Sequence, residues 1–454
     1  MRRALILGSA LVWLAAPLPA EETRFPAVLA GHAVLPALTL VPPPPDAPRD
    51  ALVSGKFATA VRGVRNDRPL SFEGDTFGFH GSRGTSLFLP FIGQPVQGFS
   101  GFAMDPAPDG SVYAIIDNGF GSRISSPDAL LSFARLAPDF ATGAVDVVEQ
   151  VWLRDPNRVV PFRLAYEGTE ARYLTGADFD PESLQVIGEE VWIGDEFGPY
   201  LISAALDGVV TGVHEARMDG AALRSPDHPA LRIPAPAGTA WRVPRSGGFE
   251  GLALQPRTGL LWAVLERPML DETGAPEGRF LRATAFDPVA RAWTGESLRI
   301  ALSDGAVALG DVNFIDETRA LMIERDGGEG DPSLRCEGPP RPDCFPNPAV
   351  IKRVVLIDEA DRDADCAARR IGHIDLMDIA DPDGLARLAT DAARDLTGRF
   401  TMPFTTIESV RRVDDAHILV AVDNNLPFST GRRLDRALDN EFVLLRVPEL
   451  LSAR

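Results

Sequence analysis

The fold can be predicted from the segment Gly248-Phe-Glu-Gly-Leu-Ala-Leu-Gln-Pro256 and the segment that follows it, Leu260-Leu-Trp-Ala-Val-Leu-Glu-Arg267. Together they combine a short apolar strand that has an acid near its start, a turn, and a second apolar strand that ends in an acid. The same pattern begins again at Gly98, Asp180, Leu309 and Thr406. Such repetition is typical of folds that are built from one supersecondary unit.

A second β-rich hairpin follows the first in four of the five units. These hairpins fall in 131–151, 201–218, 280–302 and 351–376, whereas the fifth unit continues only with 442–447. Four antiparallel strands repeated around an axis predict an all-β protein, a β-propeller of five or six four-stranded blades. A sixth blade would lie in 50–95. A β-sandwich or two separate β domains are the alternatives.

The incomplete fifth unit predicts that the propeller is closed by an N-terminal strand. Two segments have suitable composition, 52–64 and 86–92, and closure by either would remove an exposed sheet edge. The uneven spacing of the units requires insertions. We expect one at 154–176 and another, containing a helix, at 384–396.

The N-terminus has the features of an export signal. Met1-Arg2-Arg3 precedes an apolar run that ends near Leu18, and the small residue Ala20 precedes two glutamates. Residues 1–20 are therefore predicted to be a signal peptide cleaved near Ala20, which implies a periplasmic or secreted protein. The run is shorter than the roughly 20 residues of a membrane span, so no stable membrane insertion is expected. Residues 21–50 would form a Pro-rich N-terminal arm, and 51–454 a single propeller domain.

The charge of the chain narrows the choice of partners. Asp and Glu number 64 against 45 Lys and Arg, giving a net charge of −19. A nucleic-acid partner is not expected, because phosphate backbones recruit basic surfaces. The oligomeric state stays open.

Three cysteines, Cys336, Cys344 and Cys366, bear on the redox compartment. An oxidising compartment favours pairing. Cys336 and Cys344 flank a Pro-rich loop, so we predict a local disulfide between them, with Cys344–Cys366 as the alternative.

The repeated acids predict a functional site. The pattern gives equivalent points on the first strands to Ser100, Glu182, Glu250, Asp311 and Glu408. The second strands end at Asp117, Asp195-Glu196, Glu266, Glu324 and Asp423. First strands of a propeller line its channel, so these carboxylates would converge and repel one another. A cation such as Ca²⁺, which prefers six to eight oxygen ligands, or partner arginines would offset that repulsion.

The candidate residues therefore fall into three groups. The metal ligands would be Asp117, Glu182, Glu250, Asp311, Glu324, Glu408 and Asp423. The catalytic carboxylates would be Glu182, Asp195, Glu196, Glu250 and Glu266. The substrate would be held by Asn118, Arg123, Arg267, Arg325 and Asn424.

The chain resembles the phytase-like family known for esterase-like activity of phytase, a family of exported bacterial proteins. The matching motifs are 98–106 with 113–119, 180–183 with 192–198, and 248–253 with 261–266; the leader segment 25–33 is also similar. The resemblance covers most of the mature chain and implies a hydrolase of ester or phosphoester bonds. It supplies no catalytic residue set.

Two functions of different classes follow. The first is an exported esterase or phosphatase that acts on a small-molecule ester or phosphoester through Ca²⁺ at the carboxylates. The second is a non-catalytic binding or scaffolding propeller of the cell envelope in which Ca²⁺ is structural. Turnover of p-nitrophenyl esters with Ca²⁺ or with a chelator separates them.

Overall fold

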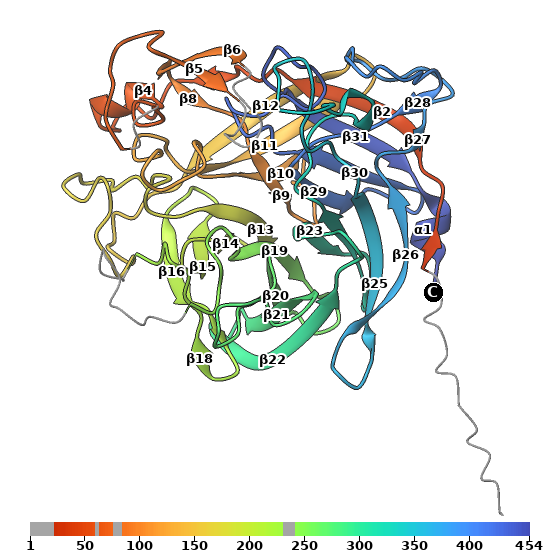
Figure 1. Ribbon diagram of the computed structural model, residues 1–454. Coiled ribbons are helices and arrows are strands. Elements are labelled where there is room, and N and C mark those ends of the chain that lie inside the picture. Colours follow the sequence, from red (N-terminus) through yellow and green to blue (C-terminus); the bar gives the residue numbers. More distant parts are fainter. Residues whose placement is uncertain (1–21, 60–62, 76–83, 230–240) are drawn as a thin grey trace, which may run out of the picture.

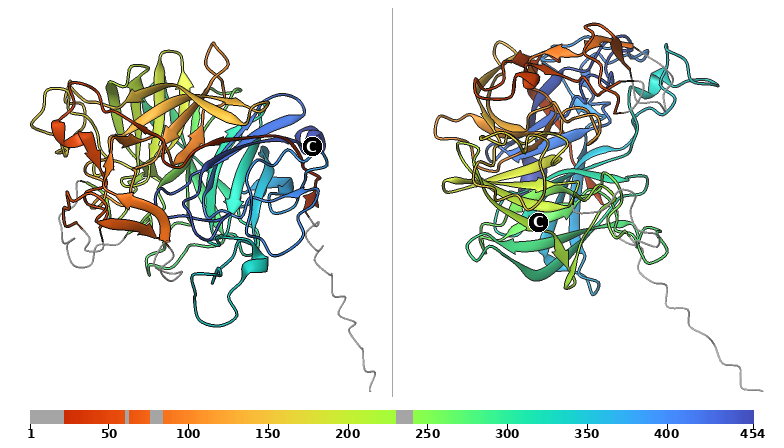
Figure 2. Two further views of the ribbon diagram at one scale, coloured as in Figure 1. Left: turned by 90° about the horizontal axis from the view of Figure 1, so that it is seen from above. Right: turned by 90° about the vertical axis from the view of Figure 1, so that its left-hand side faces the viewer.

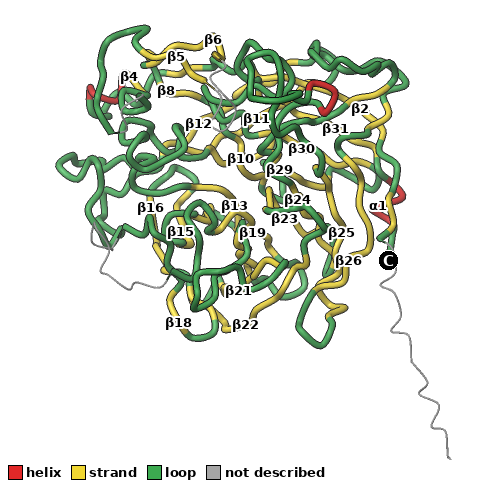
Figure 3. The backbone as a smooth tube through the Cα atoms, in the orientation of Figure 1, coloured by secondary structure: helices red, strands yellow, loops and turns green. Residues whose placement is uncertain are grey.

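The computed structural model describes residues 22–59, 63–75, 84–229 and 241–454, and these form a nearly all-β protein (Figure 1). The described helices are short, with α1 at Pro448–Ser452 and 3₁₀ turns η1 at Arg49–Leu52 and η2 at Pro332–Leu334 (Figure 3). No helix in these ranges has the length and apolar character needed to cross a bilayer. The signal peptide predicted for 1–20 lies outside the described residues.

Twenty strands form five antiparallel groups of four, here called the first to fifth sheets; one parallel strand pairing joins the first and fifth. The first sheet contains β9 (Phe99–Phe102), β10 (Val112–Ile116), β11 (Ser132–Asp139) and β12 (Ala144–Trp152). The second contains β13 (Pro181–Ile187), β14 (Glu190–Asp195), β15 (Tyr200–Ala205) and β16 (Val210–Glu215). The third contains β19 (Phe249–Leu254), β20 (Leu261–Leu265), β21 (Phe280–Asp287) and β22 (Ala292–Ala301). The fourth contains β23 (Ala308–Phe314), β24 (Arg319–Arg325), β25 (Lys352–Arg362) and β26 (Ala368–Asp375). The fifth contains β29 (Ile407–Arg412), β30 (His417–Val422), β31 (Asn440–Arg446) and β2 (Val28–Leu35). The predicted hairpins are thus confirmed.

The first strands of the five sheets lie together at the centre of the view in Figure 1. Each of β9, β13, β19, β23 and β29 contacts the next one in this order, and β29 also contacts β9. Apolar clusters fill the space between successive sheets, because strands buried on both faces carry continuous apolar runs. Phe133 packs with Ile193 between the first and second sheets, and Phe99 packs with Phe442 between the first and fifth.

The strand that completes the fifth sheet does not come from 52–64 or 86–92, so that prediction was wrong. It is β2, which pairs antiparallel with β31 from Val28 opposite Arg446 to Leu35 opposite Asn440. Prolines flank this eight-residue apolar run, and their position just outside the strand leaves its hydrogen-bond ladder intact. Residues 28–35 of the expected N-terminal arm are therefore part of a sheet.

Shorter elements decorate the five sheets. The small strands are β1 (Thr23–Arg24), β3 (Leu40–Val41), β4 (Val53–Ser54), β5 (Phe72–Asp75), β6 (Gly84–Leu89), β7 (Phe91–Ile92), β8 (Gln94–Pro95), β17 (Arg217–Met218), β18 (Ala221–Ala222), β27 (Ile379–Ala380) and β28 (Arg399–Phe400). The described part of 50–95 forms two-stranded sheets and no four-stranded one.

The helix expected at 384–396 is absent from this fully described segment, which is a loop. The Asp381 carboxylate accepts hydrogen bonds from the backbone N–H groups of Leu385 and Ala386. A side chain that binds these donors competes with the first turn of a helix.

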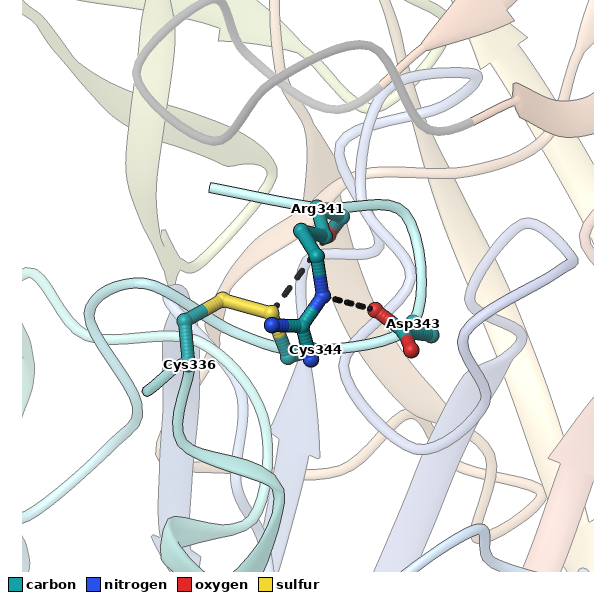
Figure 4. The surroundings of a disulfide bond; sticks show 4 residues. All are labelled: Cys336, Arg341, Asp343 and Cys344. Atoms are coloured by element: carbon teal, nitrogen blue, oxygen red, sulfur yellow. Dashed lines mark hydrogen bonds and ion pairs between the residues drawn. A yellow bond between two sulfur atoms is a disulfide. The ribbon is translucent and has the colours of Figure 1, made fainter. Parts of the chain in front are cut away.

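The loop between β24 and β25 projects from the body (Figure 2) and contains the disulfide. Cys336 and Cys344 are bonded, as the sequence predicted, while Cys366 is exposed and free. Arg341 braces the loop by donating to Asp343 (Figure 4).

Candidate functional site

A β-bulge near the start of each first strand sets the geometry of the site. In the second, third and fifth sheets the pairing register shifts at Glu182, Glu250 and Glu408. In the first and fourth sheets the same position holds Ser100 and Gly310. A bulge bends the strand and re-aims the side chain of the extra residue. The bulges thus present three glutamates from three different sheets.

A second set of equivalent positions lies on the second strands, one residue beyond the residue that pairs with the one just before the bulge. Ile116 opposes Phe99 in the first sheet, and Leu265 opposes Phe249 in the third, so Asp117 and Glu266 come next. The same register in all five sheets defines this set. Its members are Asp117, Glu196, Glu266, Arg325 and Asp423.

These two sets, with Asp180, bring eight carboxylates to one place, which we call the central acid cluster. Its members are Asp117, Asp180, Glu182, Glu196, Glu250, Glu266, Glu408 and Asp423. Carboxylate oxygens of Asp180, Glu182 and Glu196 lie within 4.8 Å of one another, as do those of Glu196, Glu250 and Glu266. Asp117 is half-buried and the other seven are buried.

Burial and mutual repulsion shift the titration of the cluster. Burial raises the pKa of Asp180 to about 6 and that of Glu408 to about 8. The pKa values of Glu182, Glu196 and Glu250 also lie well above the ordinary range, first because of burial and then because neighbouring carboxylates repel their negative charge. Ionising the whole cluster at neutral pH therefore needs compensating positive charge.

Arginine supplies part of that charge. The buried Arg325 guanidinium donates to Glu266 Oε1 at 2.8 Å and to Glu408 Oε1 at 2.9 Å. Arg267 Nε lies 2.8 Å from Glu266 Oε2, and the Arg267 side chain is half exposed. Arg325 is thus buried and hydrogen-bonded within the cluster, whereas Arg267 also faces solvent.

Two carboxylate oxygens of the cluster lack a partner. Glu196 Oε1 and Glu250 Oε1 accept no hydrogen bond from the described residues, although Glu196 is only 5% exposed and Glu250 2%. Buried polar atoms are nearly always satisfied, so each such oxygen calls for an explanation. Oxygens on opposite sides of a calcium ion, each about 2.4 Å from it, lie about 4.8 Å apart. The oxygen triads are therefore compact enough to hold such an ion.

The structure separates three of the predicted site acids from the cluster. Asp311 follows the bulge residue Gly310 and accepts from the backbone N–H groups of Val312 and Val410, both at 2.7 Å. Glu324 precedes Arg325 and binds Arg370 and Ser303. A shift of one residue along a strand turns a side chain to the opposite face.

Asp195 also precedes a cluster position. Its carboxylate accepts from the backbone N–H groups of Asp180 and Gly198, both at 2.8 Å, and burial raises its pKa to about 7. It therefore braces the turn that presents Glu196.

The other predicted substrate-binding residues make contacts within the protein. Asn118 Nδ2 donates to Asp180 Oδ1 at 2.6 Å, so Asn118 orients a cluster acid. Asn424 accepts from Gly98 N–H and donates to the Leu438 carbonyl. Arg123 donates to the carbonyls of Ala177 and Asp227.

Sequence reasoning missed Asp180 as a site residue. It occupies the position that Gly98 and Gly248 hold in the first and third units. The sequence does contain a signal for Asp180 as a site residue, since an acid replaces a glycine that is repeated in two other units.

Comparison with known proteins identifies a family for this chain. The family model "Phytase-like: Esterase-like activity of phytase" matches residues 94–426. No curated protein sequence matches the chain significantly.

Several solved structures resemble the chain weakly. Glutaminyl cyclase from Myxococcus xanthus is 11% identical with a TM-score of 0.33, covering 77% of this chain and 91% of its own. A GH43 endo-arabinanase from Bacillus licheniformis is 10% identical with a TM-score of 0.35, covering 78% and 94%. A GH43 β-1,3-galactosidase is 9% identical with a TM-score of 0.37, covering 83% and 94%. At these scores the likenesses say nothing about what this chain does.

Proposed function

The chain belongs to the phytase-like family described by esterase-like activity of phytase, and from this premise we propose that it is an exported hydrolase of ester or phosphoester bonds. The reaction would take place at the central acid cluster with the help of a bound metal ion. One observation carries the proposal: buried carboxylate oxygens from the second and third sheets converge within 4.8 Å, and two of these residues, Glu196 and Glu250, each have an oxygen without a hydrogen-bond partner.

The fold would be a five-bladed propeller closed by β2. Support comes from the five four-stranded sheets, from the contacts between successive first strands and from the pairing of β2 with β31. In this arrangement the cluster lies at the end of the central channel where the second strands terminate.

Calcium is the proposed ion, because a set made only of carboxylate oxygens suits a hard cation. Its ligands would come from the two oxygen triads, whose members are Asp180, Glu182, Glu196, Glu250 and Glu266. A bound cation of this kind polarises a phosphoryl or acyl oxygen and lowers the pKa of a water molecule.

The residues of the chain would divide the remaining tasks. Arg267 would contact the negative group of the substrate, because it is half exposed beside Glu266. Arg325 would hold Glu266 and Glu408 in position through its two hydrogen bonds. Glu182, the most exposed carboxylate of the two triads, would accept a proton from the attacking water.

Export rests on the sequence of residues 1–20. The Cys336–Cys344 bond supports it, because structural disulfides persist in oxidising compartments. The protein would then be periplasmic or secreted.

The proposal is tested by turnover of p-nitrophenyl phosphate and p-nitrophenyl acetate. Hydrolysis that needs calcium, stops with EDTA and falls at least tenfold in Glu250→Gln would support it. Glu359→Gln is the matched control, since Glu359 is a buried acid whose partners are Arg257 and Arg362. Calcium binding without turnover of either ester would instead favour the scaffolding function.

A further inference from the structure

The two oxygen triads of the central acid cluster overlap in a single residue. One combines Asp180 and Glu182 with Glu196, and the other combines Glu250 and Glu266 with Glu196. The first is built within the second sheet. The second takes its other two members from the third sheet. Glu196 therefore lies between two separate groups of acids.

The fold explains why there are two triads. Each of the two sheets contributes the same pair of positions, the bulge residue and the residue after the second strand. These pairs are Glu182 with Glu196 and Glu250 with Glu266. The repeat has thus placed two copies of one acidic pair side by side.

In the fourth sheet a cationic side chain of the protein takes the place of an acid. This sheet has Gly310 and Arg325 at the two equivalent positions, and an added Cβ at Gly310 would lie 2.1 Å from the Ile407 carbonyl oxygen. No glutamate fits there, and the Arg325 guanidinium binds Glu266 and Glu408 instead. A cationic side chain of the protein therefore already occupies this side of the cluster.

In the second triad arginine binds only Glu266, and no cationic side chain among the described residues binds the first triad. Glu196 Oε1 and Glu250 Oε1, one in the shared residue and one in the second triad, are buried without a hydrogen-bond donor among the described residues. The cluster holds eight carboxylates against the two guanidinium groups of Arg325 and Arg267. If all eight are ionised, one divalent ion leaves four negative charges uncompensated and two ions leave two.

We propose that the site binds two divalent cations bridged by the Glu196 carboxylate, one held by Asp180 and Glu182 and the other by Glu250 and Glu266. This inference rests on the proposed function only for the presence of a metal site. Paired ions about 3.5 to 4 Å apart can hold two oxygens of one tetrahedral phosphoryl group. The substrate class is accordingly a phosphoester rather than a carboxylic ester.

The first test counts ions in the metal-stripped mature protein. Calorimetric titration with Ca²⁺ should give two equivalents. Titration with Mn²⁺ should give a second ion whose binding changes the electron paramagnetic resonance spectrum of the first by spin coupling. A stoichiometry of one or none, or two ions without coupling, overturns the proposal. Both measurements use the unaltered chain and do not depend on the folding of a variant.

Variants then assign the ions. Asp180→Asn should remove one equivalent and Glu250→Gln the other, whereas Glu196→Gln should weaken both at least tenfold. Glu359→Gln should keep both. Loss of a single ion in Glu196→Gln with the other unchanged contradicts the bridge.

Activity measured on the same samples separates the two proposals. Two bound ions without ester turnover would refute the hydrolase and leave the paired site standing. Turnover with a single bound ion would do the reverse. Turnover of p-nitrophenyl acetate without p-nitrophenyl phosphate would overturn the phosphoester assignment.

Discussion

Two acidic regions in the interior of this protein are built in opposite ways. Glu441, on β31, is held by Arg432 through hydrogen bonds of 2.7 Å to each of its oxygens, and His32 Nε2 lies 3.0 Å from Glu441 Oε2. Burial alone would raise the pKa of Glu441, but Arg432 and His32 lower it to about 2. In the central acid cluster, where carboxylates outnumber cations, burial raises the pKa of Glu408 to about 8.

Burial therefore does not by itself determine the ionisation of an acid in this fold. At Glu441 the chain supplies the matching cation, and the region acts as a structural lock between β2 and β31. In the cluster the chain supplies too few cations, which leaves the folded state with unfavourable like-charge contacts. Such an arrangement costs stability and is typical of functional sites.

Glu441→Gln should produce the largest effect, because it leaves Arg432 buried without its carboxylate. We expect a loss of about 3 to 5 kcal/mol in the free energy of unfolding. Chemical denaturation at neutral pH measures it. An unchanged denaturation midpoint would show that the Glu441–Arg432 pair does not stabilise the folded protein, and the contrast with the central acid cluster would not hold.

The pH dependence of this loss has a definite sign. The folded-state pKa of Glu441 is depressed to about 2, so the folded protein binds fewer protons there than the unfolded chain, whose glutamates titrate near 4.3. Its stabilisation is fully present above the unfolded value and disappears as the pH falls toward 2. The stability gap between wild type and Glu441→Gln should therefore narrow over this interval. A gap that stays constant would contradict the assignment.

Arg325→Gln should have an intermediate effect, because it removes the cation that the chain itself places in the cluster. Loss of charged hydrogen bonds to Glu266 and Glu408 should lower the stability of the metal-free protein by about 2 kcal/mol. Calcium should then raise the melting temperature more in the variant than in the wild type. Thermal unfolding with calcium or EDTA compares the two. An equal response to calcium would mean that Arg325 and the metal do not share the task of compensation.

Glu250→Gln should have the smallest effect and the opposite sign. Removing one of several repelling charges should stabilise the metal-free protein by about 1 kcal/mol at pH 8. Denaturation in EDTA measures this gain, with Glu359→Gln as the control that should lose stability. A destabilised Glu250→Gln in EDTA would show that Glu250 is compensated in a way that the structure does not reveal.

The sequence predicted most of the strands because each unit repeats the same apolar hairpins. It also predicted that acids near Glu182, Glu250 and Glu408 would meet. It could not resolve the fourth unit, where the acid of Gly310-Asp311 lies one residue past the bulge. Since neighbouring residues face opposite sides of a strand, this single offset decides whether a carboxylate joins the cluster. The repeat in the sequence is not exact to one residue, so it does not determine which side of the strand each acid faces.

The strand β2 escaped prediction for a different reason. It is an apolar run of strand length, but the surrounding prolines suggested an extended arm, and its partner β31 lies about four hundred residues away in the chain. The residues around β2 contain no signal that indicates a pairing over such a distance in the sequence. Asp180 could not be predicted from the repeat, because an acid stands at this position in a single unit.

The pairing of β2 with β31 also orders events during folding. β2 leaves the ribosome or a translocation channel about four hundred residues before its neighbour β31. β2 must therefore wait, with one hydrogen-bonding edge unpaired, until the intervening residues and β31 have emerged. A contact of such long sequence separation is slow to form, so truncation before residue 440 would leave a chain that collapses but cannot finish its assembly.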